Sequence, residues 1–188
     1  MQLMTNFVYL IIIVFVLYGY TATRRVRLLP TYTFLYPDNE EESKRVHAEM
    51  LRRTREMEDF FYLTDESVSH AFTKVVDRSV DELDSIYAPY TLLIMFLKYL
   101  INRARPAQVN ADVRKLKLKS ISANSPVLPS GHSLQAFVLA KILSKEYPSK
   151  KEILYNTAER CGHARIIAGL HYPSDHELSK NIVAMLPL

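Results

Sequence analysis

The tetrapeptide at residues 129–132, Pro-Ser-Gly-His, stands directly before residues 134–143, whose apolar positions recur at helical spacing. This pattern predicts a tight loop that opens a helix. The start of a helix presents backbone N–H groups without partners and a partial positive charge, so it suits an anion. Ser130 adds a hydroxyl, Gly131 lets the backbone approach a ligand closely, and His132 can exchange a proton near neutral pH. Alone the tetrapeptide is ordinary turn chemistry, so its meaning depends on the partners that the chain brings to it.

Two other stretches, one on each side of this loop, carry the residue types that a phosphate site needs. The upstream stretch has the spacing Lys-x6-Arg-Pro at the end of an apolar run, and the downstream stretch has the spacing Arg-x5-His-x3-Asp. Their members are Lys98, Arg105, Pro106, Arg165, His171 and Asp175. The two arginines offer planar, permanently charged forks that bind phosphoryl oxygens in pairs, and the lysine offers a point charge.

The two histidines of these stretches can divide the roles of nucleophile and acid between them. His171 and Asp175 are four residues apart, so the carboxylate can hold one ring nitrogen protonated and leave the other free to attack. Pro173 lies between them and suggests a turn, so the pair can instead meet across a helix start. In either arrangement His171 is the better candidate for the nucleophile.

In this order and at these spacings, the three stretches resemble the signature of the type 2 phosphatidic acid phosphatase (PAP2) superfamily. This superfamily includes bacterial acid phosphatases, lipid phosphate phosphatases and vanadium haloperoxidases. Its signature reads Lys-x6-Arg-Pro, then Pro-Ser-Gly-His, then Ser-Arg-x5-His-x3-Asp, and the chain departs from it only at the last Ser, which is Ala164. The motifs span residues 98–175, and the preceding region is loosely similar to the soluble, acid-phosphatase-like branch. The missing hydroxyl removes at most one neutral hydrogen bond, which is worth about 0.5 to 1.5 kcal/mol. We therefore expect a lower rate or affinity and not loss of function.

The resemblance implies an all-α fold, a compact helical bundle of the acid phosphatase/vanadium haloperoxidase type. It also implies that His171 forms a phosphohistidine intermediate, with Asp175 as its catalytic partner. His132 would protonate the leaving oxygen and then activate the water that releases phosphate. The substrate's phosphate would be bound by Lys98, Arg105, Ser130, Gly131 and Arg165. No metal or other cofactor is expected, because the carboxylates do not cluster with histidines at ligand spacing, and vanadate would act as an inhibitor.

Residues 7–20 form an apolar run without charge, and the uncharged stretch extends back to the start of the sequence. Arg24, Arg25 and Arg27 follow at once. Residues 3–20 reach the lower limit for a helix that spans a bilayer, roughly 17 to 25 residues. We therefore expect residues 1–23 to be an N-terminal transmembrane helix that anchors the chain. A cleaved signal segment is the main alternative, although signals usually carry their positive charge before the apolar run. A helix buried in the domain is the other alternative, but such a helix usually has a polar face.

The rest of the chain divides into an arm and one domain. Residues 24–37 contain two prolines and several aromatic residues, which predicts an extended linker. Residues 38–188 are expected to form a PAP2-like phosphatase domain. Positively charged residues next to a membrane span tend to stay on the cytoplasmic side. A single-pass membrane protein with its catalytic domain on that side is therefore expected.

The composition narrows the class of the domain. A chain of 188 residues is long enough for one core and too short for two comfortable domains. With 48% hydrophobic and 23% charged residues, it belongs with ordered globular proteins. The net charge of +4 gives no reason to expect a nucleic-acid partner. Cys161 is the only cysteine, which excludes an intrachain disulfide.

Capping signals and periodicity predict where helices lie in this domain. We expect helices from Asp38 to Phe61, from Ser67 to Val76, after Ser79, over residues 91–102, from Ser149 to Arg165, and a short one after Ser174. The helix over residues 91–102 is apolar on most faces and is expected to be buried in the core. Residues 112–119 carry four basic side chains. They are expected either as a solvated loop or as a loop at the mouth of the site that attracts anionic substrates.

Together these features predict an enzyme, a metal-independent phosphatase that hydrolyses phosphomonoesters through a phosphohistidine intermediate. The substrate is expected to be a lipid phosphate such as phosphatidic acid or a small phosphomonoester. Two alternatives remain open. A vanadate-dependent haloperoxidase would use the same anion site, with vanadate as its cofactor bound to His171. A non-catalytic, membrane-anchored protein would only bind phosphate.

Overall fold

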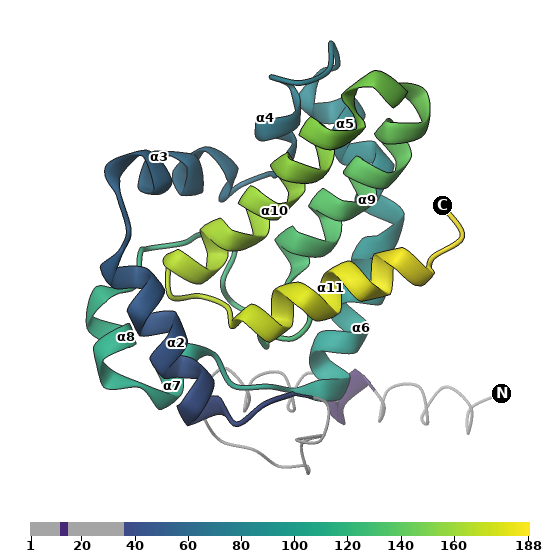
Figure 1. Ribbon diagram of the computed structural model, residues 1–188. Coiled ribbons are helices and arrows are strands. Elements are labelled where there is room, and N and C mark those ends of the chain that lie inside the picture. Colours follow the sequence, from purple (N-terminus) through teal and green to yellow (C-terminus); the bar gives the residue numbers. More distant parts are fainter. Residues whose placement is uncertain (1–11, 15–35) are drawn as a thin grey trace, which may run out of the picture.

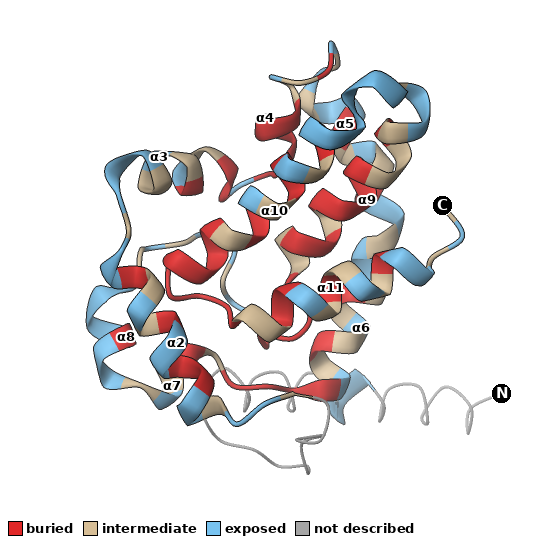
Figure 2. Ribbon diagram, in the orientation of Figure 1, coloured by how far each residue is buried: buried red, intermediate tan, exposed pale blue. Residues whose placement is uncertain are grey.

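The computed structural model describes residues 12–14 and 36–188, and within these ranges it contains helices and loops but no strand (Figure 1). The prediction of an all-α fold is confirmed for this part of the chain. Three long helices form its centre: α9 (Gly131–Glu146), α10 (Lys151–Ile167) and α11 (Pro173–Met185). Helix α9 packs against both of the others. It is buried around most of its circumference (Figure 2), because it carries no charged residue before Lys141.

The remaining α-helices surround this centre, and none of them is longer than α11. They are α2 (Asn39–Leu51), α3 (Arg55–Thr64), α4 (Ser69–Phe72), α5 (Val80–Tyr87), α6 (Thr91–Ile101), α7 (Pro106–Val109) and α8 (Ala111–Leu116). Helices α2 and α3 both contact α10, whereas α5 and α6 contact α9. The largest apolar cluster therefore has α9 at its middle, with Phe137, Leu139 and Leu143 fully or almost fully buried.

The helix predicted over residues 38–61 is present, but the structure divides it in two. Asp38 caps α2 as expected, because its side chain accepts the backbone N–H groups of Glu40 and Glu41, both at 2.9 Å. The helix ends at Leu51, and α3 begins after Thr54, whose hydroxyl accepts a backbone N–H of the new helix at 3.3 Å. A threonine at a helix start offers the backbone this alternative bond. The prediction of one continuous helix was therefore wrong.

Other predicted helix boundaries also need correction. The helix expected over residues 67–76 is reduced to the four residues of α4. The capping box expected at Ser149 is absent, because a short 3-10 helix, Pro148–Lys150, precedes α10. The helix expected after Ser174 is not short, since α11 has 13 residues. The start of α5 follows the prediction, because Ser79 and Glu82 form a capping box.

Helix α6 is not the buried core helix that its composition predicted. Its inner face carries Ile94, Lys98 and Ile101, which are all buried, whereas Leu92 on its outer face is 80% exposed. The outward side chains are apolar as well, so the pattern of residue types does not distinguish the two faces. Residues 111–116 also differ from the prediction, because they form helix α8 and not a loop.

No helix in the described ranges is long and apolar enough to cross a membrane. The expected anchor, residues 1–23, lies outside the described residues except for residues 12–14. The expected linker, residues 24–37, lies outside them except for its last two residues. The anchor and the linker therefore stay predictions.

A fully buried arginine, Arg103, joins α2 to α11 from the loop between α6 and α7. One terminal nitrogen donates to Glu42 Oε2 at 2.6 Å, and the other donates to Asp175 Oδ1 at 2.7 Å. The guanidinium carbon lies 4.3 Å from the ring centroid of Tyr36 and 3.8 Å from that of Tyr172. The two carboxylates and two aromatic faces compensate the cation for its removal from water. This arginine brings Asp175, a predicted site residue, into a fixed position.

Candidate active site

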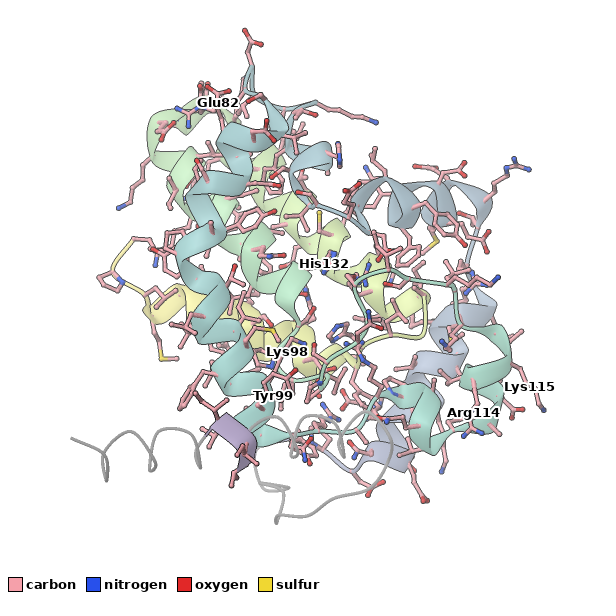
Figure 3. All side chains as sticks on the ribbon, turned by 180° about the vertical axis from the view of Figure 1, so that it is seen from behind. Glu82, Lys98, Tyr99, Arg114, Lys115 and His132 are labelled. Atoms are coloured by element: carbon pink, nitrogen blue, oxygen red, sulfur yellow. The ribbon has the colours of Figure 1, made fainter. Side chains whose placement is uncertain are left out.

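The predicted loop forms the start of α9. Ser130 is the N-cap of the helix, and its hydroxyl accepts the Ser133 N–H at 3.4 Å. Lys98 lies beside this helix start, because a Cβ added to Gly131 would be 3.9 Å from Lys98 Cε. In Figure 3, Lys98 and His132 lie toward the middle of the view and away from the outer edge of the molecule. The structure thus brings the first two predicted stretches together around one helix N-terminus.

Lys98 is held by the backbone of the loop that precedes α9. Its Nζ donates to the carbonyl oxygens of Pro126 at 2.7 Å and Val127 at 3.3 Å. Burial, followed by the nearby charge of Arg105, lowers the pKa of Lys98 well below its usual value. Among the described residues Nζ has no further partner, so in its ammonium form its third N–H can bind a ligand.

Arg105 is fixed by two backbone carbonyls. Its Nε donates to Ser125 O at 2.9 Å, and one terminal nitrogen donates to Leu170 O at 3.0 Å. Burial, followed by the charge of Arg165, lowers the pKa of Arg105 to about 10. Arg105 therefore remains a cation at neutral pH. It is partly exposed, whereas Lys98 and Arg165 are buried.

Arg165 is buried and is held on its outer side by a carboxylate. One terminal nitrogen donates to Asp65 Oδ1 at 2.7 Å, and the other donates to the hydroxyls of Ser120 at 3.1 Å and Ser122 at 3.0 Å. Within the part of the chain that the structure describes, its Nε–H is buried without a partner. A buried donor without a partner is costly, so this N–H is a natural contact for a phosphoryl oxygen.

Asp65 is a residue of this site that the sequence did not reveal. Besides Arg165, its carboxylate accepts the Ser120 hydroxyl at 2.6 Å and the Ile121 N–H at 3.0 Å. Burial raises the pKa of Asp65, but the bonds from Ser120 and Arg165 outweigh it and the pKa is lowered. Asp65 is separated from Arg165 by 100 residues, so no local pattern could connect them.

His132 lies beside Asp65. Its Nε2 is 3.0 Å from the carbonyl oxygen of Asp65. A carbonyl can only accept, so Nε2 carries the proton and Nδ1 carries the lone pair of the neutral ring. Burial, followed by the charge of Arg165, lowers the pKa of His132 to about 3. His132 is therefore neutral in the free protein at neutral pH.

His171 and Asp175 form the predicted pair, and they meet across a helix start. His171 Nδ1 is 3.3 Å from Asp175 Oδ2, which also accepts the backbone N–H of Tyr172 at 2.8 Å. This contact holds the proton on Nδ1 and leaves the lone pair on Nε2. Burial, followed by the charge of Arg105, lowers the pKa of His171 well below its usual value. Burial also raises the pKa of Asp175, and Arg103 counteracts this effect.

The assembled site consists of three cations and two neutral histidines around the start of α9. Lys98, Arg165 and His171 are buried, whereas Arg105 and His132 are partly exposed and mark the side from which a ligand can enter. Nothing in the described site neutralises the positive charge completely, since Asp65 and Asp175 are already paired with arginines. An oxyanion with several acceptor oxygens fits this arrangement.

The outer part of the basic segment lies apart from this cluster. Arg114 and Lys115 of the basic segment lie at the outer edge of the molecule, away from Lys98 and His132 (Figure 3). They therefore do not flank the mouth of the site. Ala164, which replaces the signature Ser, lies in a small apolar cluster beside Phe61, Ala168 and Leu170.

The described residues contain no group of three or more His, Cys, Asp or Glu side chains that could hold a metal ion. Comparison with known families matches residues 85–182, just over half of the chain, to the PAP2 superfamily. The matched region begins before α6 and ends within α11, so it contains all three signature stretches. No curated protein matches the chain. The likeness to the soluble, acid-phosphatase-like branch stays a prediction.

We expect inorganic phosphate to raise the melting temperature of the full-length chain, because it should bind only the folded arrangement of cations. At a phosphate concentration 100 times its Kd, the gain in the free energy of unfolding should be about 2.7 kcal/mol. Arg105→Met should lose most of this gain, whereas Arg114→Met, which removes an outer arginine, should keep it. Equal gains in all three proteins, measured by calorimetry, would show that phosphate binds elsewhere.

Proposed function

The chain belongs to the PAP2 superfamily, and from this we propose that it is a metal-independent phosphatase that hydrolyses phosphomonoesters through a phosphohistidine on His171. The observation that carries the proposal is the pairing of His171 with Asp175 beside three cations. His171 Nδ1 faces the carboxylate at 3.3 Å, so Nε2 is left with its lone pair in a site that attracts phosphate. An oriented nucleophile and a preformed set of charges are what phosphoryl transfer requires.

In the proposed binding step, the phosphoryl oxygens replace the solvent at the start of α9. Lys98 supplies its third N–H, Arg165 supplies Nε–H, and Arg105 supplies its partly exposed guanidinium. The Gly131 N–H and the Ser130 hydroxyl complete the set of donors. Because these groups are held by backbone carbonyls and by Asp65 before the ligand arrives, little reorganisation is needed when charge develops in the transition state.

In the first chemical step, His171 Nε2 attacks phosphorus and the bond from phosphorus to the alcohol oxygen breaks. The leaving oxygen takes a proton from His132 Nδ1. Because the free protein holds His132 neutral, this proton arrives with the substrate, either on a phosphate monoanion or by uptake as the dianion binds. In the second step, the neutral His132 takes a proton from water as that water attacks the phosphohistidine. Phosphate is released together with the proton that His132 took from the water, so His132 returns to its neutral form and His171 regains its lone pair.

The proposed substrate is a lipid phosphate such as phosphatidic acid or a small phosphomonoester. Both share the phosphoryl group that the site binds, and they differ in the alcohol. A membrane anchor in residues 1–23, with the domain on the cytoplasmic side, would favour the lipid. The outward position of Arg114 and Lys115 (Figure 3) removes one reason to favour it, so substrates of both kinds belong in the test.

The test is phosphate release by the full-length chain with EDTA present, on p-nitrophenyl phosphate and on phosphatidic acid in detergent micelles. We expect the wild type to release phosphate, and His171→Ala to lose the activity by more than the 10²- to 10⁴-fold typical of a general acid. The matched control is His163→Ala, because His163 lies on α10 with 45% of its side chain exposed and contacts Glu49.

Activity that survives in His171→Ala would contradict the phosphohistidine route. A folded wild type that binds vanadate, releases no phosphate and oxidises halide with peroxide would point to the haloperoxidase instead. Binding of phosphate without any turnover would point to the non-catalytic protein. The faster of the two substrates would decide between the lipid and the soluble alcohol.

The lowered pKa values of the two histidines predict activity at acidic pH. The nucleophile acts as the base form, which exists above its pKa, so lowering the pKa of His171 extends its action to lower pH. The proton for the leaving group is carried by the substrate, because the pKa of His132 is lowered to about 3. An alkyl phosphate loses its last proton at about pH 6. The value of kcat/KM should therefore fall about tenfold per pH unit above that pH, and a constant or rising value would contradict this account.

A further inference from the structure

A second chain of buried hydrogen bonds begins at Ser130 and leads away from the cations. Ser133 Oγ lies 2.9 Å from Ser130 Oγ, and His176 Nδ1 lies 3.0 Å from Ser133 Oγ. On the other side of the imidazole, Nε2 lies 2.8 Å from Glu159 Oε2, and the second oxygen of this carboxylate binds Lys180. This chain connects the hydroxyl at the phosphate site with a charged pair near the surface.

The ring of His176 is fixed between α9 and α10. Only 6% of the residue is exposed, and its ring centroid lies 5.5 Å from that of Phe137. On the α10 side, a Cβ added to Gly162 would lie 1.9 Å from His176 Nδ1. Only glycine leaves room for the ring at this point. The position of His176 therefore depends on a glycine inside a helix, where glycine is otherwise unfavourable.

The hydrogen-bond partners determine which nitrogen of His176 carries a proton. Burial raises the pKa of Glu159, but the bonds from Lys180 and His176 outweigh it and the pKa is lowered, so Glu159 is ionised at neutral pH. A carboxylate can only accept, and the nitrogen that faces it therefore donates. Nε2 of His176 carries a proton in both charge states of the ring, and Nδ1 carries one only in the imidazolium.

The charge of His176 sets the direction of the hydroxyl bonds. In the imidazolium, Nδ1–H donates to Ser133, whose own proton goes to Ser130 Oγ. The proton of Ser130 then has no acceptor among the described residues, and it is left for a phosphoryl oxygen. In the neutral ring, Nδ1 instead accepts the Ser133 proton. Ser133 Oγ then becomes a competing acceptor for the Ser130 proton, which turns lone pairs of Ser130 toward the phosphate.

We infer that His176, acting through Ser133, is a positioning residue that decides whether Ser130 donates a hydrogen bond to the phosphoryl group. The inference rests on the proposed function, because it concerns the same phosphate site. The charged groups that face the ring are Glu159 from α10 and Lys180 from its own helix, whereas α9 presents Ser133 and Phe137. Binding of phosphate is therefore strongest while His176 is charged, and it weakens when the ring loses its proton.

The test compares the affinity of the full-length wild type for inorganic phosphate with that of His176→Asn, by calorimetry over the range where histidines titrate, about pH 5 to 8. The asparagine amide can take the place of Nδ1 and donates at every pH. The ionisation of phosphate itself cancels in the ratio of the two affinities. At low pH the two affinities should be nearly equal. At the high end of the range the variant should bind phosphate about tenfold more tightly than the wild type, because only the variant keeps the hydrogen bond from Ser130 to the charged phosphoryl group. His163→Asn, the matched control, should follow the wild type.

A ratio that is the same at every pH would overturn the inference, including a constant loss that accompanies a lower melting temperature. A different result would contradict the proposed function alone. In that case the ratio of the two phosphate affinities changes with pH as expected, but no phosphoester is hydrolysed. If the wild type binds no phosphate at any pH, both are overturned.

A second measurement uses the wild type alone, so its result does not depend on whether the variant folds. Nitrogen-15 NMR of the imidazole distinguishes protonated from unprotonated Nδ1. If phosphate prefers the charged ring about tenfold, linkage requires that phosphate keep the Nδ1 proton of His176 in place to about one pH unit higher. A titration of His176 that phosphate does not move would contradict the inference.

Discussion

The geometry of the site depends on the burial of Arg103 between two carboxylates. Asp175 divides its oxygens, because Oδ1 accepts from Arg103 at 2.7 Å while Oδ2 faces His171 Nδ1 and the backbone N–H of Tyr172. Glu42 takes the other side of the guanidinium at 2.6 Å. Breaking a buried pair of this kind costs about 3 to 5 kcal/mol, mostly because a charge is left buried without a partner. The arginine therefore fixes the orientation of His171, the proposed nucleophile, and through Glu42 it makes that orientation depend on the packing of α2.

Burial of the two histidines beside the cations explains the protonation of the site. Three cations are crowded at the start of α9, where the helix adds its own partial positive charge. Burial and these charges lower the pKa values of His132 and His171, so both rings are neutral before a ligand binds. In the proposed mechanism, phosphate has a double role. It supplies the negative charge that the site lacks, and it brings the proton that His132 passes to the leaving oxygen.

The sequence predicted the residues that we propose to bind the phosphate, and it missed the residues that hold them in place. The signature spacing identified His171 and Asp175, because chemistry restricts the residue types at those positions. Arg103 lies between two signature residues, and its partners are 61 and 72 residues away, so no local pattern indicates it. Asp65 was missed for the same reason. Gly162 was a usable signal, since a glycine inside a long predicted helix suggests a close packing partner, which is His176.

The sequence pattern also gave a wrong prediction for a helix whose outward side chains are apolar. The exposed face of α6 carries the same residue types as its buried face, so the pattern suggested a core helix where the structure has a surface one. The exposure of α6 is determined by tertiary packing, which composition does not encode.

The proposed passage of the phosphoryl group through His171 can be observed by rapid quenching of the wild type during turnover of a ³²P-labelled phosphomonoester. We expect label that is stable to base and labile to acid, on the peptide that contains His171. Label on another residue, or turnover without any labelled protein, would contradict it.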